Sequence, residues 1–238
     1  MAKFEFSKET KDAIFKQRLK TFLGPKAFFL ARKYLRRKSF YPPRFHELQT
    51  IFIHIPKSAG TSLGEALFHT GRTGHFEWSL YRAEDRDAFE NYFKFCFVRE
   101  PVSRFLSAYN YLVDGGKDPY DAAMGRDVAK YGDVNAFILS GLRDDGWSKL
   151  RHFRPQVSFL CDDKMNVMVD FIGRMERFDA DCETIGKKIG VDLKPAKSNR
   201  TKRKVVAKSD LSKEALDTLV QIYRDDFAAF NYPVPERE

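Results

Sequence analysis

The pattern of apolar and polar positions along the chain changes near residue 50. Residues 50–55 form a short, nearly continuous apolar run, and residues 93–98 form a second one. Runs of this length are typical of strands that are buried on both faces, as in a parallel sheet. Residues 167–172 supply a third strand candidate.

Helical patterns follow the first two strand candidates and return near the C-terminus. Pro101 opens a helix after the second strand, and Ser212 is placed to cap a late one. The apolar face of the Pro101 helix is formed by Val102, Phe105, Leu106 and Tyr109. Strands that alternate with helices predict an α/β fold with a central parallel sheet flanked by helices.

The first 48 residues are predicted to form a basic helical arm, and residues 49–238 the main domain. Phe15, Leu19, Phe22 and Leu23 recur near helical spacing, and a Gly-Pro pair at residues 24–25 breaks the pattern. The whole chain carries 42 Lys and Arg against 33 Asp and Glu, a net charge of +9. The arm holds 13 of the basic and four of the acidic residues, so the main domain is balanced with 29 of each.

This uneven charge bears on what the protein binds. A balanced main domain argues against a nucleic-acid-binding face, which requires clustered basic residues. The arm is expected either to pack its aromatic side onto the domain or to contact an anionic surface, a membrane or a glycan. The charge pattern alone does not choose between these two roles.

Cysteine usage and hydropathy suggest a cellular location. The three cysteines form no disulfide-like or metal-like pattern, and no His/Cys cluster suggests a metal site. The chain begins without the apolar core of a signal peptide, and no apolar run approaches the roughly 20 residues of a membrane helix. We therefore expect a cytoplasmic protein without a bound metal.

The segment between the first strand and its helix has the composition of an anion-binding loop. A small-residue loop exposes backbone N–H groups beside the positive end of a helix, which suits a phosphate or a sulfate. The candidate binding residues are Lys57, Ser58, Ala59, Gly60, Thr61 and Ser62. The order differs from a Walker P-loop, because Lys57 precedes Gly60 instead of following a second glycine.

A second candidate site spans the end of the second strand and the next helix. Arg99 lies at the carboxyl end of the strand, where open α/β sheets bind ligands. Ser107 projects from the helix away from its apolar face. An arginine fork together with a hydroxyl suits a terminal phosphate.

These two motifs, in this order, resemble those of the sulfotransferases that use 3′-phosphoadenosine 5′-phosphosulfate (PAPS). The similarity extends over about residues 50–232 and is strongest to the carbohydrate-type branch that includes heparan sulfate 2-O-sulfotransferase. The weaker matching segments are residues 152–156, 173–178, 199–204 and 222–232. The resemblance implies a P-loop-like nucleotide-binding sulfotransferase fold, PAPS as donor, its desulfated form PAP as product, and no metal.

Within that resemblance, individual residues acquire expected roles. Lys57 and the loop amides would stabilise charge on the transferred group, and Arg99 with Ser107 would hold the 3′-phosphate. Relatives carry Asp or Asn where Glu100 stands, and glutamate is a poorer N-cap, which puts the capping of this helix in doubt.

The catalytic base is expected to be His75, since the branch carries its base in a similar Gly-His segment. His152 is the reserve, as base or acceptor contact, and Glu77 is a third option. Gln156 is a weaker candidate for contact with the acceptor. His54 falls inside the first predicted strand and is interpreted as structural.

The predicted function is transfer of a sulfuryl group from PAPS to a hydroxyl of an acceptor, with a carbohydrate expected. The first alternative is a P-loop kinase or NTPase, which requires a Walker lysine and a magnesium-binding acid after a strand; we find neither arrangement. The second is a basic, non-enzymatic anion-binding protein that uses the arm. A sulfotransferase-like fold without activity is a third, which Lys57, Arg99 and Ser107 argue against.

Overall fold

The computed structural model describes residues 5–34, 39–69, 73–195 and 206–235, which fall into two compact units. The first, here called the sheet unit, comprises Phe22–Arg99 and Gln156–Asn199. The second, here called the helical unit, comprises Met1–Thr21, Glu100–Pro155 and Arg200–Glu238. The boundary at residue 48 that the sequence suggests falls inside the sheet unit, and the start of the predicted arm is part of the helical unit.

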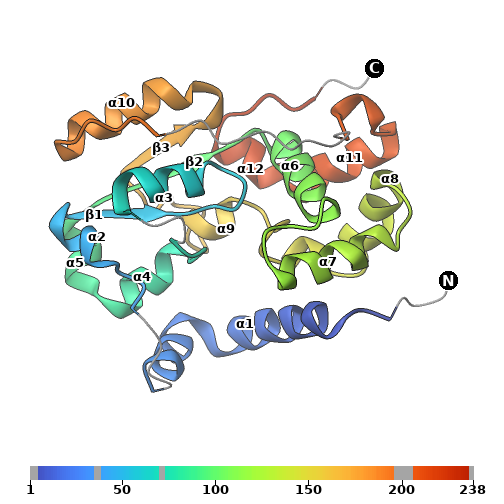
Figure 1. Ribbon diagram of the computed structural model, residues 1–238, viewed down its shortest axis with the longest axis horizontal. Coiled ribbons are helices and arrows are strands. Elements are labelled where there is room, and N and C mark those ends of the chain that lie inside the picture. Colours follow the sequence, from blue (N-terminus) through green and yellow to red (C-terminus); the bar gives the residue numbers. More distant parts are fainter. Residues whose placement is uncertain (1–4, 35–38, 70–72, 196–205, 236–238) are drawn as a thin grey trace. The chain divides into compact units, whose positions relative to one another are not determined.

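The sheet unit is built on three parallel strands in the order β1–β2–β3 (Figure 1). β1 is Thr50–Ile53, β2 is Phe93–Val98 and β3 is Phe171–Arg174. In this register Phe52 lies opposite Phe95, and Cys96 lies opposite Ile172. All of β1 is buried, as a central apolar strand requires. The predicted α/β fold with a parallel sheet is confirmed.

The third strand begins later than the sequence suggests. Val167 forms an isolated antiparallel bridge with Cys161, so the chain at this point does not yet run along β2. Asp170 then joins β2, because its carboxylate accepts the Lys94 backbone N–H at 2.7 Å and its own N–H donates to the Lys94 carbonyl at 2.8 Å. Regular parallel pairing therefore starts only at Phe171.

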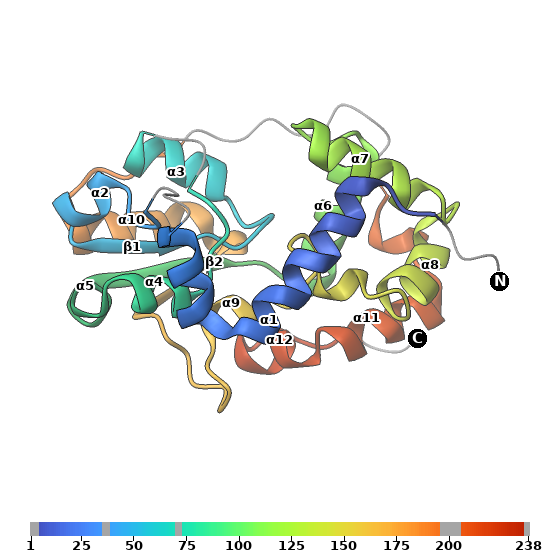
Figure 2. The same cartoon turned by 90° about the horizontal axis from the view of Figure 1, so that it is seen from below.

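Helices cover both faces of the sheet. They are α2 (Pro43–Glu47), α3 (Gly60–Phe68), α4 (Trp78–Glu84), α5 (Arg86–Asn91), α9 (Val157–Leu160) and α10 (Phe178–Ile189). Phe97 of β2 packs on Phe178 of α10, with ring centroids 5.1 Å apart. Lys94, which points to the other face, places its ammonium 5.4 Å from the Phe89 ring of α5. Figure 2 shows α3 and α10 on one side of the strands and α4 and α5 on the other.

The helical unit packs around aromatic side chains. Apart from the start of α1, which is described below, its α-helices are α6 (Pro101–Val113), α7 (Pro119–Ala129), α8 (Val134–Ala136), α11 (Lys213–Ile222) and α12 (Arg224–Ala229). Phe105, Phe137, Trp147 and Phe153 are fully buried and contact one another through their rings. These side chains supply the large apolar area that stabilises the unit.

A fully buried arginine crosses this core. The Arg104 guanidinium donates to the carbonyls of His152 at 3.2 Å and Arg154 at 2.8 Å. It also lies 5.3 Å from the Tyr223 ring centroid. The hydroxyl of Tyr223 in turn donates to the Phe153 carbonyl at 2.6 Å. The turn at residues 152–154 is therefore fixed by Arg104 of α6 and by Tyr223, which lies between Ile222 and Arg224 where two C-terminal helices meet.

The helix starts confirm one sequence signal, the Ser212 cap, and resolve the doubt about Glu100. The Glu100 carboxylate accepts the backbone N–H of Val102 at 3.1 Å and of Ser103 at 2.6 Å, so glutamate does cap α6. Ser212 caps α11 by accepting the N–H of Ala215 at 3.2 Å. Both contacts satisfy N–H groups that a helix start leaves without partners.

Helix α1 (Lys8–Tyr34) contains the break that the Gly-Pro pair predicts. Gly24 takes φ 71° and ψ 170°, which interrupts the helix, and Pro25 begins the second segment. A side chain at a φ of this sign is unfavourable, so glycine suits the kink. In the part of the chain that the structure describes, none of the helices, α1 included, has the length and apolar character needed to cross a bilayer.

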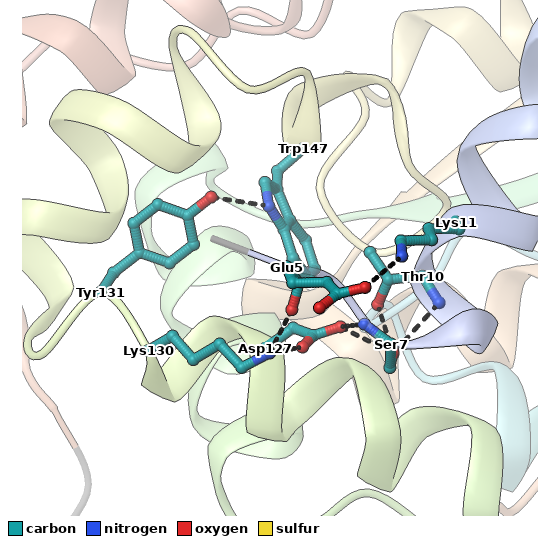
Figure 3. Close-up of polar contacts among 8 residues, drawn as sticks. All are labelled: Glu5, Ser7, Thr10, Lys11, Asp127, Lys130, Tyr131 and Trp147. Carbon is teal, nitrogen blue, oxygen red and sulfur yellow. Dashed lines mark hydrogen bonds and ion pairs between the residues drawn. The ribbon is translucent and has the colours of Figure 1, made fainter. Parts of the chain in front are cut away.

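The start of α1 is fixed to α7 by a buried carboxylate (Figure 3). Asp127 is almost fully buried, and its Oδ2 accepts from the Ser7 backbone N–H at 2.9 Å and from the Ser7 hydroxyl at 2.6 Å. Lys130 donates from its ammonium to Asp127 Oδ1 and to the Glu5 carbonyl, at 2.7 and 2.6 Å. The Ser7 hydroxyl also accepts the N–H of Thr10 at 3.3 Å, which caps the helix.

The contacts of Asp127 predict that the free energy of unfolding decreases at acid pH. Burial raises the pKa of Asp127, but hydrogen bonds from Lys130, Ser7 and Thr10 outweigh burial and hold the pKa below its ordinary value of 3.8. The stabilisation is therefore complete above that value and is lost as the pH falls through the lowered pKa of the folded state. We expect Asp127→Asn to cost about 1–3 kcal/mol at neutral pH and to flatten the acid dependence in urea unfolding. An unchanged acid profile would contradict this assignment, and Asp163→Asn, on an exposed residue, is the control.

Candidate active site

The loop between β1 and α3 has an unusual backbone. The φ angle is positive at Lys57 (70°) and at Ala59 (58°), but not at Ser58 between them. Alternation of this kind turns successive N–H groups toward the same side and forms a concavity that binds anions. For residues with side chains such angles cost of order 1–3 kcal/mol each, and they persist chiefly at functional sites. The loop is therefore shaped for an anion.

The loop also presents polar groups that are ready to bind a ligand. The Ser58 hydroxyl is fully buried and has no hydrogen-bond partner among the described residues, although buried hydroxyls are normally bonded. Ala59 offers no side-chain cap to α3, so the first N–H groups of this nine-residue helix stay available. A helix start of this kind favours phosphate or sulfate oxygens.

His54 lies immediately after β1 and packs on the loop. A Cβ atom on Gly60 would stand only 1.6 Å from His54 Nε2, so the imidazole occupies the place of a side chain at residue 60. The other ring nitrogen, Nδ1, is 2.9 Å from the Thr73 hydroxyl, and the His54 side chain is buried. His54 therefore supports the floor of the anion-binding loop.

His75 meets His54 at the same place. The two imidazole centroids are 4.1 Å apart, and His75 Nδ1 lies 3.2 Å from the His54 carbonyl oxygen. A carbonyl only accepts, so this contact makes Nδ1 the protonated nitrogen of neutral His75 and leaves Nε2 with the lone pair. The predicted base thus contacts His54, the residue that packs on the predicted anion-binding loop.

Arg99 follows β2 at the same edge of the sheet as the loop, because β1 and β2 are parallel neighbours. Its backbone is held by Gln156, which is fully buried: the Arg99 N–H donates to Gln156 Oε1 at 3.0 Å, and Gln156 Nε2 donates to the Arg99 carbonyl at 2.9 Å. Gln156 therefore positions the strand end that carries the arginine. Its predicted contact with an acceptor stays a prediction.

Ser107 belongs to the helical unit, on α6. It shares the less buried stripe of that helix with Ser103 and Asn110. Asn110 exchanges two hydrogen bonds with the backbone of Val206, each 2.9 Å long. The polar segment at residues 199–204, predicted to cover the nucleotide, lies outside the described residues. The chain after it returns beside Asn110, one turn from Ser107.

His152, the reserve base, lies in a buried network of the helical unit. Its Nε2 is 3.4 Å from Asp121 Oδ1, and both side chains are about 95% buried. Asp121 also accepts from the Tyr111 hydroxyl at 2.5 Å and from Arg151 at 2.9 Å. Glu77, the third option, is half-buried just before α4.

Sequence reasoning missed the role of His54 and Thr73. His54 was assigned to the interior of a strand, but β1 ends at Ile53 and His54 emerges at the edge where ligands bind. The sequence did carry one signal for this role: His54 comes directly before the predicted loop, four residues after Thr50, where a short strand can already have ended. Thr73 carries no sequence signal, because its contact with His54 arises only on folding. Among the described residues there is no group of three or more His, Cys, Asp or Glu side chains arranged for a metal ion.

The packing of His54 on Gly60 leads to a testable expectation. Gly60→Ala forces the added methyl into the imidazole, and overpacking of this kind costs about 1–3 kcal/mol. Thermal and urea unfolding measure that cost. In a His54→Ala background the same change should cost little, because the ring that it strikes is gone. An equal cost in both backgrounds would contradict the contact.

The fold and these motifs define a class of protein. The model of the sulfotransferase family matches residues 45–233, nearly the whole chain after α1, and this chain belongs to that family. The family therefore agrees with the resemblance in the sequence.

A relative of known type is carbohydrate sulfotransferase 14 from Danio rerio. It is 29% identical over 174 residues, which cover 64% of this chain and 47% of that protein. The chain thus spans about half the length of this curated relative. No solved structure matches the chain described here.

Proposed function

We propose that this protein is an enzyme that transfers a sulfuryl group from PAPS to a hydroxyl of a carbohydrate acceptor. The observation that carries the proposal is the loop after β1. It combines the alternating backbone at Lys57 and Ala59, the buried Ser58 hydroxyl and the uncapped start of α3. Together these groups offer a dense set of donors to the oxygens of a 5′-phosphosulfate.

The donor is distinguished from ATP by its 3′-phosphate. Arg99, at the end of β2, offers a guanidinium fork to that group, and Ser107 offers a hydroxyl. The Gln156 amide fixes the backbone of Arg99, which limits the directions that its side chain can take. The order of Lys57 and Gly60 also differs from the Walker motif, which favours PAPS over an ordinary nucleoside triphosphate.

The chemistry needs a base and a charge stabiliser. His75 Nε2 accepts the proton of the acceptor hydroxyl as its oxygen forms a bond to sulfur. The bond between sulfur and the bridging phosphate oxygen breaks, and PAP leaves with that oxygen and its electron pair. Lys57 and the loop amides stabilise the charge that develops on the bridging oxygen and on the sulfuryl group. A loose transition state makes positioning and charge the main contributions, as in phosphoryl transfer.

A carbohydrate acceptor is supported by two observations. The relative from Danio rerio is named a carbohydrate sulfotransferase, and the segments at residues 152–156 and 173–178 resemble the carbohydrate-type branch. In this chain residues 173–174 end β3 and lead through a short helical turn into α10.

The experiment that tests the donor is thermal unfolding with PAP, ATP or ADP at equal concentration. A ligand at about 100 times its dissociation constant adds about 2.7 kcal/mol to the folded state. We expect a large rise in the melting temperature with PAP and a small one with ATP. A rise with ATP alone would favour a kinase or NTPase, and no rise with any nucleotide would contradict a nucleotide donor.

Arg99→Ala isolates the role of the 3′-phosphate. A charge-assisted hydrogen bond contributes about 1.5–3 kcal/mol, so PAP should bind about ten- to a hundredfold more weakly. ADP, which lacks that phosphate, should bind almost as it does to the unchanged protein. Titration calorimetry with both nucleotides measures the difference. Equal losses for PAP and ADP would move the 3′-phosphate site away from Arg99.

A further inference from the structure

Helix α1 has an inverted distribution of apolar side chains. The more buried side of its first segment carries Thr10, which is fully buried, and Ala13, Ile14 and Gln17, which are half-buried; of these four only Ile14 is large and apolar. Its exposed side carries Phe15, Leu19 and Phe22, with 65%, 41% and 87% of their surface exposed. These three follow i, i+4, i+7 spacing and therefore form one continuous stripe. An amphipathic helix that only packs on its own protein has the opposite arrangement.

Exposed large apolar side chains are concentrated on α1. Among the described residues ten large hydrophobic side chains are exposed, and six of them belong to α1. They are Phe15, Leu19, Phe22, Leu23, Leu30 and Tyr34. Scattered exposed apolar residues are ordinary, but the stripe of Phe15, Leu19 and Phe22 before the Gly24 kink is contiguous and marks an interaction surface. Helix α1 precedes residues 45–233, which the sulfotransferase family accounts for, so the stripe is not explained by membership of that family.

The charge around the stripe indicates what covers it. Residues 8–34 contain eight Lys and Arg and two Asp and Glu, a net charge of +6. Lys16 and Arg18 are exposed and flank the stripe, each one helical position from Phe15 or Leu19. Basic side chains beside an apolar stripe bind lipid headgroups with their charged ends while their stems follow the apolar surface.

We infer that α1 is a docking surface for the interface of an anionic phospholipid membrane. A soluble polyanion would neutralise the charge but would leave Phe15 and Phe22 in water. A second copy of the chain would bring two strongly basic faces together, which is repulsive. An anionic bilayer complements both features, since its headgroups attract the basic residues and its interfacial region takes up the apolar ones.

The anchor at the start of α1 serves this surface. Ser7 and Lys130 bind Asp127 and fix the first turn (Figure 3). The fixed first turn sets the rotation of the helix and therefore the side on which the stripe lies. The segment before the kink, residues 8–23, is about 24 Å long at the helical rise per residue. That length allows the segment to lie in the plane of the membrane surface without crossing it.

The test is co-sedimentation of the full chain with vesicles of phosphatidylcholine mixed with phosphatidylserine, and with vesicles of phosphatidylcholine alone. We expect association with the mixed vesicles, weaker association with the neutral ones, and loss of association at high salt. The triple change Phe15→Gln, Leu19→Gln, Phe22→Gln should lower partitioning by about a hundredfold. All three positions are exposed, so the fold should be retained, and the melting temperature checks that.

A matched control removes three exposed apolar side chains from other elements: Val113→Gln, Met165→Gln and Val234→Gln. This variant should bind the mixed vesicles as the unchanged protein does. No association of the unchanged protein, or equal loss in both triple variants, would overturn the inference. So would binding to heparin that equals vesicle binding and survives the α1 changes, which would identify a soluble polyanion. Concentration-dependent dimers that the α1 changes abolish, without vesicle binding, would identify a second copy.

Discussion

Replacing Lys57 with alanine is expected to lower the turnover number about 10²–10³-fold while changing the affinity for PAP much less. Lys57 lies in the anion-binding loop, and its charge is needed most when the bridging oxygen becomes negative in the transition state. PAP lacks the sulfuryl group and therefore reports binding without that transition-state charge. Initial rates at saturating donor and titration with PAP measure the two quantities separately.

The Lys57→Ala substitution should leave the backbone conformation of the loop as it is in the unchanged protein. Lys57 already has a positive φ of 70°, and alanine meets the same steric cost there. Lys164→Ala, on an exposed residue of the same unit, is the matched control and should change neither quantity. Equal losses in turnover and in PAP affinity would assign Lys57 to ground-state binding and would contradict the role proposed here.

Replacing His75 with alanine is expected to lower turnover about 10²–10⁴-fold, the usual contribution of a general base, with PAP binding retained. The reason is geometric: His75 Nδ1 lies 3.2 Å from the His54 carbonyl oxygen, so the acceptor proton is assigned to the other ring nitrogen, Nε2. Added imidazole should restore part of the activity, because it supplies a base in the vacated place. Single-turnover rates with bound donor measure this step directly.

The His75 result needs a control for packing, since its ring also contacts His54 at 4.1 Å. His69→Ala, at the exposed C-terminal end of α3, removes an imidazole from the same unit without touching that contact. It should leave turnover unchanged. Full activity in His75→Ala would move the base to His152 or Glu77, with the Asp121–His152 pair as the first place to look.

The sheet and the first helices could be predicted because their signals are local. A continuous apolar run requires burial on both faces, and this alone identified β1 and β2. Pro101 and the apolar spacing after it identified α6 in the same way. The third strand begins four residues later than predicted, because the start of that apolar run forms a bridge between Cys161 and Val167.

The candidate site was predictable only in part. The composition of residues 55–62 and the position of Arg99 indicated anion binding, because both follow buried strands. The sequence placed His54 inside a strand, whereas it lies under the loop and against His75. Gln156 showed no sign of its bond to Arg99, since the two residues are 57 positions apart. Contacts of this range depend on how the whole unit packs.

By itself the sequence determined the α/β class and the order of the three strands, predicted the anion-binding loop, and showed in its motifs a resemblance to the family to which the chain belongs. These follow from hydrophobic periodicity and from small local motifs, which act over a few residues. Only the tertiary structure brought His75 Nδ1 to the His54 carbonyl and packed His54 against Gly60. Only there do the two hydrogen bonds between Gln156 and the Arg99 backbone form. The tertiary structure also turned the apolar stripe of α1 outward and tied Ser7 to Asp127, 120 residues away. Side chains remote in sequence meet only in the folded chain, where burial and hydrogen bonding fix their orientation.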